Sequence, residues 1–234
     1  MIDPAISLGF FDTAQRLFGS VRSGIAVVFE GDDHRVVREP PSLEEESEGW
    51  LAGLGEEGEV RFHPTSPPAE VDDARTFLCR VRGRVGGREL ACLGTATETV
   101  TPPAWGELDA TRFLVAAFDE GTGLVAHSRR PRGVIGHGGE AIAGAVFAAG
   151  ELRSVEELRI STVYDGDGRQ RTAGLELWLP GEEFPRRASG EARAGVSLAL
   201  EGLRVQLAML TWRMDGREGA GAYELTVREE ERAA

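Results

Sequence analysis

The stretch LRVQLAMLTWRMDGREGAGAYE, residues 203–224, decides the fold of this chain. Its first half alternates like a β-strand, with Val205 and Leu207 on one face and Trp212 on the other. Asp215-Gly216 then supplies the two-residue turn of a hairpin, and a strand rich in small residues follows. We therefore expect two long antiparallel strands that close a β architecture.

The same alternation extends over residues 75–230 and is broken at short intervals by Gly-rich turns. Residues 76–85 place Phe77 and Val81 on one face and Arg80 on the other, and Gly86-Gly87 turns this strand back. Similar segments recur at 110–119, 124–128, 156–164 and 172–179. Many short strands at such spacing predict an all-β, antiparallel barrel or sandwich, and closure of a barrel leaves few exposed strand edges.

Two segments are open to a helical interpretation. Phe10, Phe11, Ala14, Leu17 and Phe18 recur at spacings that favour a short amphipathic helix over an opening strand. Residues 140–149 alternate as a strand but are rich in Ala, so a helix is the alternative there. Residues 25–30 and 34–37 predict a hairpin around a Gly-Asp-Asp turn.

Residues 40–58 differ in composition from the rest, because two prolines precede a run of glutamates. We expect an exposed acidic loop or short helix anchored by Trp50. A lid over the mouth of a cavity is the alternative function of this segment.

Composition bounds the function. The chain has 234 residues and a net charge of -13, so a nucleic-acid backbone is an unfavourable partner. No basic, apolar leader and no stretch of ~20 apolar residues is visible, which predicts a soluble cytoplasmic protein. In a reducing cytoplasm Cys79 and Cys92 are expected to be free thiols, although they lie on neighbouring predicted strands.

Sequence motifs for metals and cofactors are missing. No Cys/His metal spacing, no nucleophile elbow and no phosphate-binding Gly loop before a helix occurs. Residues 165–168 (Asp-Gly-Asp-Gly) resemble the start of a calcium loop, but no Glu stands at the twelfth position, so a hairpin turn is expected. We therefore expect neither a metal nor a cofactor; the oligomeric state is left open.

Four segments together resemble a known family. They are Trp105-Gly106, the hairpin 160–168, the return strand 174–177 and the closing segment 214–224. In this order they are similar to the C-terminal half of the lipocalin-like paired β-barrel family, which includes hydroxyneurosporene synthase (carotenoid 1,2-hydratase), tocopherol-cyclase-like proteins and many bacterial members. The resemblance implies a full C-terminal lipocalin-like barrel at 94–234, packed on an abbreviated N-terminal β domain at 1–93.

The resemblance also implies a function. The family binds elongated hydrophobic molecules such as isoprenoids, polyenes, sterols or lipid-like polyketides, and its chemistry is cofactor-free hydration, cyclisation or isomerisation. Protonation of an alkene needs a neutral carboxylic acid, and aromatic faces stabilise the resulting cation. A carrier that only binds the ligand is the alternative, and a partner-binding protein with a filled barrel is a third class.

The candidate catalytic residues are Glu107, Asp109, His137 and Glu140. Glu107 and Asp109 alternate with Trp105 at the entry to an apolar strand, so the three share one face; alternatively Trp105 plugs the barrel end and the acids lie in a solvated loop. His137 and Glu140 occupy a Gly-rich turn that leaves room for substrate, and an exposed turn is the alternative.

Candidate ligand-binding residues are Trp105, His127, Tyr164, Trp178 and Trp212. His127 ends a strand and could serve as an inward acid or base, but it has no partner nearby in the sequence. The aromatic residues either stack on a ligand or pack in the core. Glu224 is expected to be a buried acid that pairs with an arginine such as Arg204 or Arg213.

Overall fold

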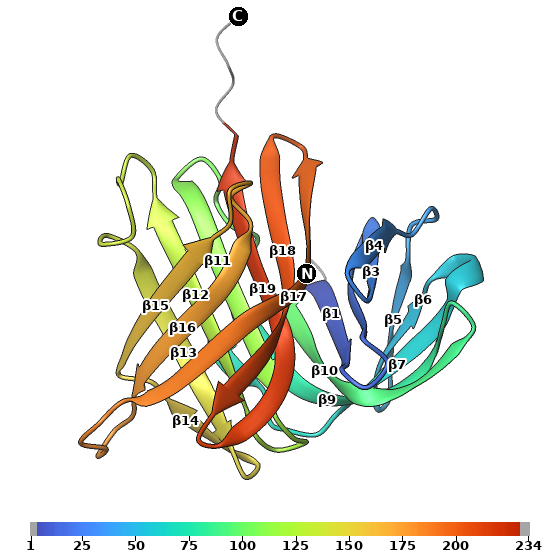
Figure 1. Ribbon diagram of the computed structural model, residues 1–234, viewed down its shortest axis with the longest axis horizontal. Coiled ribbons are helices and arrows are strands. Elements are labelled where there is room, and N and C mark those ends of the chain that lie inside the picture. The colour runs from blue at the N-terminus through green and yellow to red at the C-terminus, as the bar shows by residue number, and fades with distance from the viewer. Residues whose placement is uncertain (1–3, 230–234) are drawn as a thin grey trace, which may run out of the picture.

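The protein consists of two curled antiparallel sheets that lie side by side (Figure 1). The computed structural model describes residues 4–229. The first sheet has ten strands and the second has nine, and within 4–229 the only helical element is the short 3-10 turn η1 (Gly55–Glu57). The predicted all-β class is confirmed, as is the pair of lipocalin-like half-barrels.

The first sheet is built from the N-terminal part of the chain. Its strand order is β4-β3-β2-β1-β10-β9-β7-β6-β5, and β8 pairs with β9. The strand bounds are β1 Ala5–Asp12, β2 Leu17–Arg22, β3 Ile25–Glu30, β4 Asp33–Val36, β5 Ser42–Glu46, β6 Gly49–Gly53, β7 Gly58–Pro64, β8 Ala69–Val71, β9 Ala74–Val85 and β10 Arg88–Thr99.

The second sheet repeats this plan, because its first and last strands also pair at the centre. Its order is β14-β13-β12-β11-β19-β18-β17-β16-β15. The strand bounds are β11 Leu108–Ala117, β12 Gly123–Pro131, β13 Ala141–Ala148, β14 Glu151–Ser154, β15 Glu157–Tyr164, β16 Gln170–Trp178, β17 Arg186–Leu200, β18 Leu203–Met214 and β19 Arg217–Arg228.

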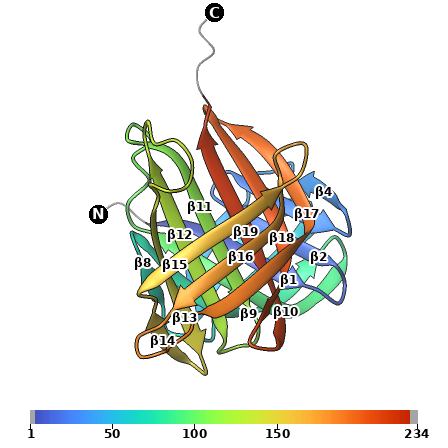
Figure 2. The same ribbon diagram turned by 60° about the vertical axis from the view of Figure 1, so that its left-hand side comes forward.

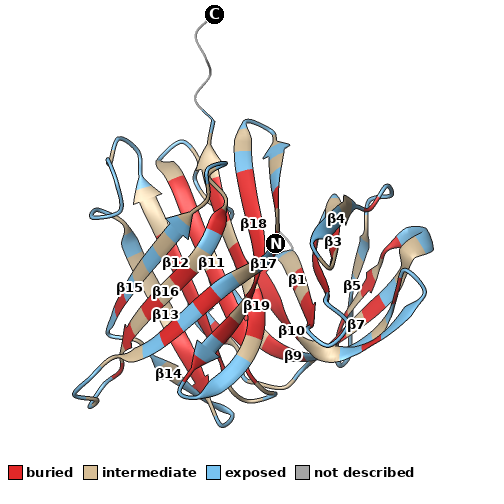
Figure 3. Cartoon of the chain, in the orientation of Figure 1, coloured by how far each residue is buried: buried red, intermediate tan, exposed pale blue. Residues whose placement is uncertain are grey.

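Three apolar clusters hold the sheets together. One fills the first half-barrel, one fills the second, and the third lies between the two sheets. Strand β11 contributes to two of them, since Leu114 faces the interior of the second half-barrel and Val115 faces the first sheet. Burial of both faces explains why residues 113–117 of this strand are all apolar, and Figure 3 shows the buried segments concentrated on the central strands.

The helix expected at residues 10–18 was a wrong prediction. These residues form β1, a turn and β2. Phe10 points into the first half-barrel while Phe11 joins the cluster between the sheets. Adjacent apolar residues therefore arise from a strand with two buried faces, a pattern that imitates helical spacing.

The acidic segment 40–58 was also predicted wrongly, as a loop or helix. It forms the hairpin of β5 and β6, followed by η1. Trp50 is buried, as expected, while the glutamates of β5 are exposed at the edge of the sheet. Charged side chains on an edge strand discourage pairing with other chains.

The two hairpin turns predicted from dipeptides are confirmed. Gly86-Gly87 has φ values of 58° and 79°, and Asp215-Gly216 has values of 50° and 75°. Two consecutive positive φ angles are the geometry of the two-residue turns that match strand twist. The Ala-rich residues 140–149 contain a strand, β13, rather than a helix.

The connection between the sheets lies at residues 100–107. Strand β10 runs past residue 93 and pairs with β1 up to Thr99, because the Thr-rich continuation 95–99 completes the ladder. The first sheet is abbreviated in strand length, since β8 has three residues and β4 has four, but not in strand number.

Candidate active site between the two sheets

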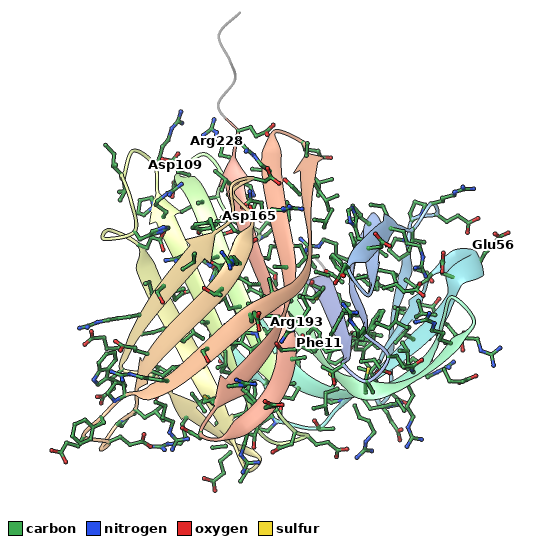
Figure 4. All side chains as sticks on the ribbon, in the orientation of Figure 1. Phe11, Glu56, Asp109, Asp165, Arg193 and Arg228 are labelled. Atoms are coloured by element: carbon green, nitrogen blue, oxygen red, sulfur yellow. The ribbon has the colours of Figure 1, made fainter. Side chains whose placement is uncertain are left out.

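A pocket of about 760 Å³ lies between the sheets, next to the connecting segment 100–107. Its walls come from both halves of the molecule, and Trp105 with the two prolines before it covers one side. Arg228, labelled at the upper end of the second sheet in Figure 4, belongs to the same pocket. The volume is typical of small-molecule sites.

His127 is the buried histidine of this pocket. It lies on β12, only 11% of its side chain is exposed, and its ring packs edge-on against Phe113 at 5.9 Å. Its Nδ1 is 2.6 Å from Oδ2 of Asp72. A carboxylate only accepts hydrogen bonds, so Nδ1–H donates to Asp72 and the lone pair is on Nε2, which makes no hydrogen bond within residues 4–229.

The protonation state of His127 follows from burial. Loss of solvent lowers the pKa of His127, and this effect outweighs the opposing pull of Asp72. The imidazole is therefore neutral at neutral pH. A neutral, oriented imidazole with a free nitrogen is suited to act as a general base.

Asp72 reaches His127 from the other sheet. It occupies the two-residue turn between β8 and β9, where its φ of 53° is in the left-handed region that Asp tolerates better than most residues. Strand β8 contacts β12 and β13, beside which it lies in Figure 2. The hairpin of β8 and β9 thus places the Asp72 carboxylate at the junction of the sheets, within hydrogen-bond distance of His127.

A second ion pair crosses the same pocket. Both terminal nitrogens of Arg22 on β2 donate to the carboxylate of Glu224 on β19. Burial alone would raise the pKa of Glu224, but Arg22 and the Thr226 hydroxyl hold it below the usual range. Glu224 is a paired acid as predicted, with 20% of its side chain exposed, but its partner is Arg22 rather than Arg204 or Arg213, because β19 faces the first sheet here.

Arg129 follows His127 by two residues on β12 and makes a further polar contact between the sheets at this pocket. Its Nη2 donates to Asp73 at 2.8 Å, and its Nε lies 3.6 Å from Asp72 without forming a hydrogen bond. Two arginines of the pocket, Arg22 and Arg129, are thus each paired with an acid of the opposite sheet.

His137 and Glu140, two predicted catalytic residues, belong to a different cluster. Glu140 lies inside the second half-barrel, where it accepts hydrogen bonds from Arg112 and from Ser128 at 3.0 Å. His137 lies 2.7 Å from the other carboxylate oxygen and is half-exposed at the rim. Burial would raise the pKa of Glu140, but His137, Arg112 and Ser128 together lower it.

The remaining predicted residues are dispersed. Trp105 lines the pocket between the sheets, Tyr164 packs at the rim of the second half-barrel and Trp212 is fully buried in its core. The guanidinium of Arg159 lies over the ring of Trp178, with 4.8 Å between its Cζ atom and the ring centre. The other two are the acids Glu107, which is exposed, and Asp109, which accepts from the Gly133 amide at 2.8 Å.

A larger groove of about 990 Å³ lies on another side of the junction. Phe11 and Arg193, labelled in Figure 4 where the sheets meet, are on its walls. Its charged groups other than Asp12 are exposed, and they include the ion pairs of Arg193 with Glu191 and Arg213 with Glu218. Asp12 is buried and accepts two hydrogen bonds from Gln15. This groove therefore offers no desolvated base comparable to His127.

Two further features of residues 4–229 concern metals and membranes. No group of three or more His, Cys, Asp or Glu side chains in this part of the chain is placed to hold a metal ion. No helix in it has the length and apolar character to cross a bilayer. Cys79 and Cys92 are free thiols, and burial raises the pKa of each to about 12.

Sequence reasoning identified His127 but missed Asp72, Arg22 and Arg129. The Asp-Asp pair at 72–73, between two short apolar segments, is a turn signal and could have marked a hairpin tip. No local pattern places that tip beside β12, since Asp72 and His127 are 55 residues apart.

Two curled antiparallel sheets with a pocket at their junction define a paired lipocalin-like fold, so the resemblance noted in the sequence is confirmed at the level of the fold. No protein-family model and no curated protein matches the sequence.

Among solved structures, the chain is similar to kievitone hydratase from Nectria haematococca, with a TM-score of 0.63 and 9% identity over 96% of this chain and 88% of that one. It is also similar to a protein from Nitrosomonas europaea described as a candidate AttH, with a TM-score of 0.60 and 12% identity over 95% and 91%. At such identities the likeness concerns the fold.

Proposed function

We propose that this protein binds an uncharged, largely apolar small molecule between its sheets and adds or removes water there, with His127 as general base. The observation that carries the proposal is the buried His127, held by Asp72 through Nδ1 and left with Nε2 for the pocket. General-base catalysis requires this orientation and a neutral ring.

The lining of the pocket supports an uncharged ligand. Arg22 and Arg129 pair with acids across the junction. The third arginine, Arg228, donates to the Trp105 carbonyl oxygen, so an anionic ligand would have to compete with partners that these arginines already have. Trp105, Phe113 and Leu203 supply apolar surface, while Thr97, Thr111 and Thr226 supply hydroxyls. Hydrophobic molecules of the isoprenoid or polyketide type, with one polar group, match this combination of apolar surface and hydroxyl groups.

The fold supports the reaction class only by analogy. One structural neighbour is named a hydratase, but a shared fold does not fix a reaction. The stronger support is chemical, because water is the nucleophile that a desolvated, neutral imidazole can activate without a further group.

The test compares His127→Gln with the wild type. Binding is followed by displacement of N-phenylnaphthylamine, an uncharged fluorescent probe, and reaction is followed by mass spectrometry as gain of one water by benzylideneacetone and prenylbenzene. We expect unchanged binding and a loss of rate of roughly 10²- to 10⁴-fold in His127→Gln. The control is His34→Gln, at an exposed histidine of the first sheet.

A carrier without catalysis gives a different result. It would bind the probe and both alkenes, hydrate neither, and respond equally to His127→Gln and His34→Gln. Native mass spectrometry of protein purified from its source would then identify the cargo directly.

A further inference from the structure

Arg129 shares a strand face with the proposed base. Residues two apart on a strand point to the same side, so His127 and Arg129 face the pocket together at a Cα separation of about 7 Å. The pairing of β12 with β11 and β13 is regular here, without a bulge that would turn either side chain away.

The guanidinium of Arg129 has donors to spare. Nη2 donates a hydrogen bond to Asp73. The other two nitrogens, Nη1 and the buried Nε, make no hydrogen bond within residues 4–229. Arg22, in contrast, uses both of its terminal nitrogens on Glu224. Arg129 can therefore donate to a ligand oxygen without giving up its existing partner. Arg228 has unused donors as well, but it lies on β19, whereas Arg129 shares the strand and the face of His127.

The carboxyl groups of the pocket are unsuited to the alternative chemistry. Hydration of an isolated alkene begins with protonation of carbon by a neutral acid. Glu224 accepts hydrogen bonds from Arg22, Asp73 accepts from Arg129, and Asp72 accepts from His127. These contacts stabilise carboxylates rather than carboxylic acids. The other acids of the lining, Glu201 and Glu229, are exposed to solvent, so burial does not favour their neutral form. The neutral acid expected from the family resemblance is therefore not what these groups provide.

We infer that the substrate is an alkene conjugated to a carbonyl group, with the carbonyl oxygen bound by Arg129 and water activated by His127. This inference rests on the proposed function and names its substrate class. A conjugated carbonyl removes the need for a strong acid, because the electrons of the alkene move to an oxygen that a guanidinium can stabilise.

The step balances without any further reactant. His127 Nε2 takes a proton from water as the water oxygen bonds to the β carbon, and the alkene electron pair moves to give an enolate whose oxygen accepts from Arg129. The proton on Nε2 then passes to the α carbon. One C–O and one C–H bond form, one O–H bond of water and the alkene π bond break, and His127 returns to its neutral state.

The test pairs Arg129→Gln with Asp73→Asn. Both variants break the ion pair between these residues, but only Arg129→Gln removes the guanidinium. With benzylideneacetone, a conjugated ketone, we expect kcat/KM to fall about 100-fold in Arg129→Gln, as when one oxyanion donor is deleted, and less than about tenfold in Asp73→Asn. Arg129→Lys should restore part of the rate, and Arg132→Gln, at an exposed loop residue, should leave it unchanged.

A second readout follows carbon protonation directly. In heavy water the wild type should place deuterium on the α carbon of the β-hydroxy ketone product, as seen by proton NMR, and His127→Gln should not. Equal losses in Arg129→Gln and Asp73→Asn would overturn the assignment of Arg129, because a structural ion pair alone predicts that result.

The two levels of the proposal fail in different ways. Hydration of prenylbenzene, an isolated alkene, at a rate that depends on His127 and not on Arg129 would overturn the carbonyl inference and leave the hydratase proposal standing. If the protein binds both compounds and hydrates neither, the carbonyl inference and the hydratase proposal are both overturned.

Discussion

The pocket between the sheets and the interior of the second half-barrel contain the same pair of groups in opposite arrangements. His127 and Asp72 are 2.6 Å apart, and His137 and Glu140 are 2.7 Å apart. In the first pair the histidine is the buried member, whereas in the second the histidine side chain is 52% exposed and the acid 2%.

This difference in burial suits the first pair to proton transfer and the second pair to stabilising the fold. A buried imidazole beside a cavity stays neutral and can take a proton, whereas a buried carboxylate surrounded by Arg112, Ser128 and His137 is ionised and saturated with donors. We therefore assign reactivity to the first pair and stability to the second. Four substitutions or conditions test this division.

Glu140→Ala should have the largest effect, and on stability. It leaves the Arg112 guanidinium buried without a countercharge, which costs about 3–5 kcal/mol of unfolding free energy. Urea denaturation followed by circular dichroism measures the loss. Glu107→Ala, at an exposed acid, is the control and should stay within about 0.5 kcal/mol.

A small effect of Glu140→Ala would contradict the structural assignment of the second pair. If Glu140→Ala does not accumulate as folded protein, Glu140→Gln is measured instead. Glu140→Gln keeps an acceptor beside Ser128, so its unfolding free energy should lie between those of the wild type and Glu140→Ala.

Asp72→Asn should reduce activity on the order of 10²-fold while leaving the unfolding free energy nearly unchanged. Asn tolerates the left-handed backbone of this turn, so the change removes the charge and not the geometry. Steady-state hydration rates measure the effect. An equal loss in Asp73→Asn would show that the turn matters only as a structural contact.

Acidification should affect the two pairs in sequence. The pKa of His127 is lowered, so its neutral form persists below pH 6.5 and activity falls only as the pH drops through that lowered pKa. The unfolded chain binds this proton first, so stability from this group also declines as pH falls below 6.5. The stabilisation from Glu140, whose pKa is lowered from 4.5, is lost at still more acidic pH.

A pH-rate profile beside a pH-stability profile checks this order. Asp72 raises the pKa of His127 against the effect of burial, so Asp72→Asn should move the acidic limb of the rate profile to lower pH. A shift to higher pH would mean that Asp72 is not the partner of His127 in solution.

His137→Gln should have the smallest effect, within about 1 kcal/mol on stability and with no change in the hydration rate. The side chain is half-exposed, and an exposed contact of this kind contributes little. Differential scanning calorimetry and the hydration assay measure both. A large loss of activity would instead support the role expected for His137 from its Gly-rich turn.

Local sequence features predicted the local structure well. Alternation and dipeptide turns such as Gly86-Gly87 identify strands because both depend on neighbouring residues. They failed at Phe10 and Phe11, because a strand that buries its two faces in two different clusters has the adjacent apolar residues that are typical of a helix. Whether a strand has one or two buried faces is decided by what packs against it, which the segment itself does not encode.

The site was predictable only in part, for the same reason. His127 was recognised as a candidate, but its partner lies in the other sheet, and Glu224 pairs with Arg22, 202 residues away. Distances of this kind arise from the docking of two sheets. Periodicity identified which residues could face inward and left open which interior they would face.

The pairs His127 with Asp72, Glu224 with Arg22 and Arg129 with Asp73 each join one sheet to the other. Neither half of the chain contains all the residues of the proposed site, so under the proposed function a measured hydration rate reports that the halves have assembled. During refolding, recovery of the hydration rate should therefore lag behind recovery of the far-ultraviolet β signal, and the interval between them gives the lifetime of a species with formed strands and undocked halves.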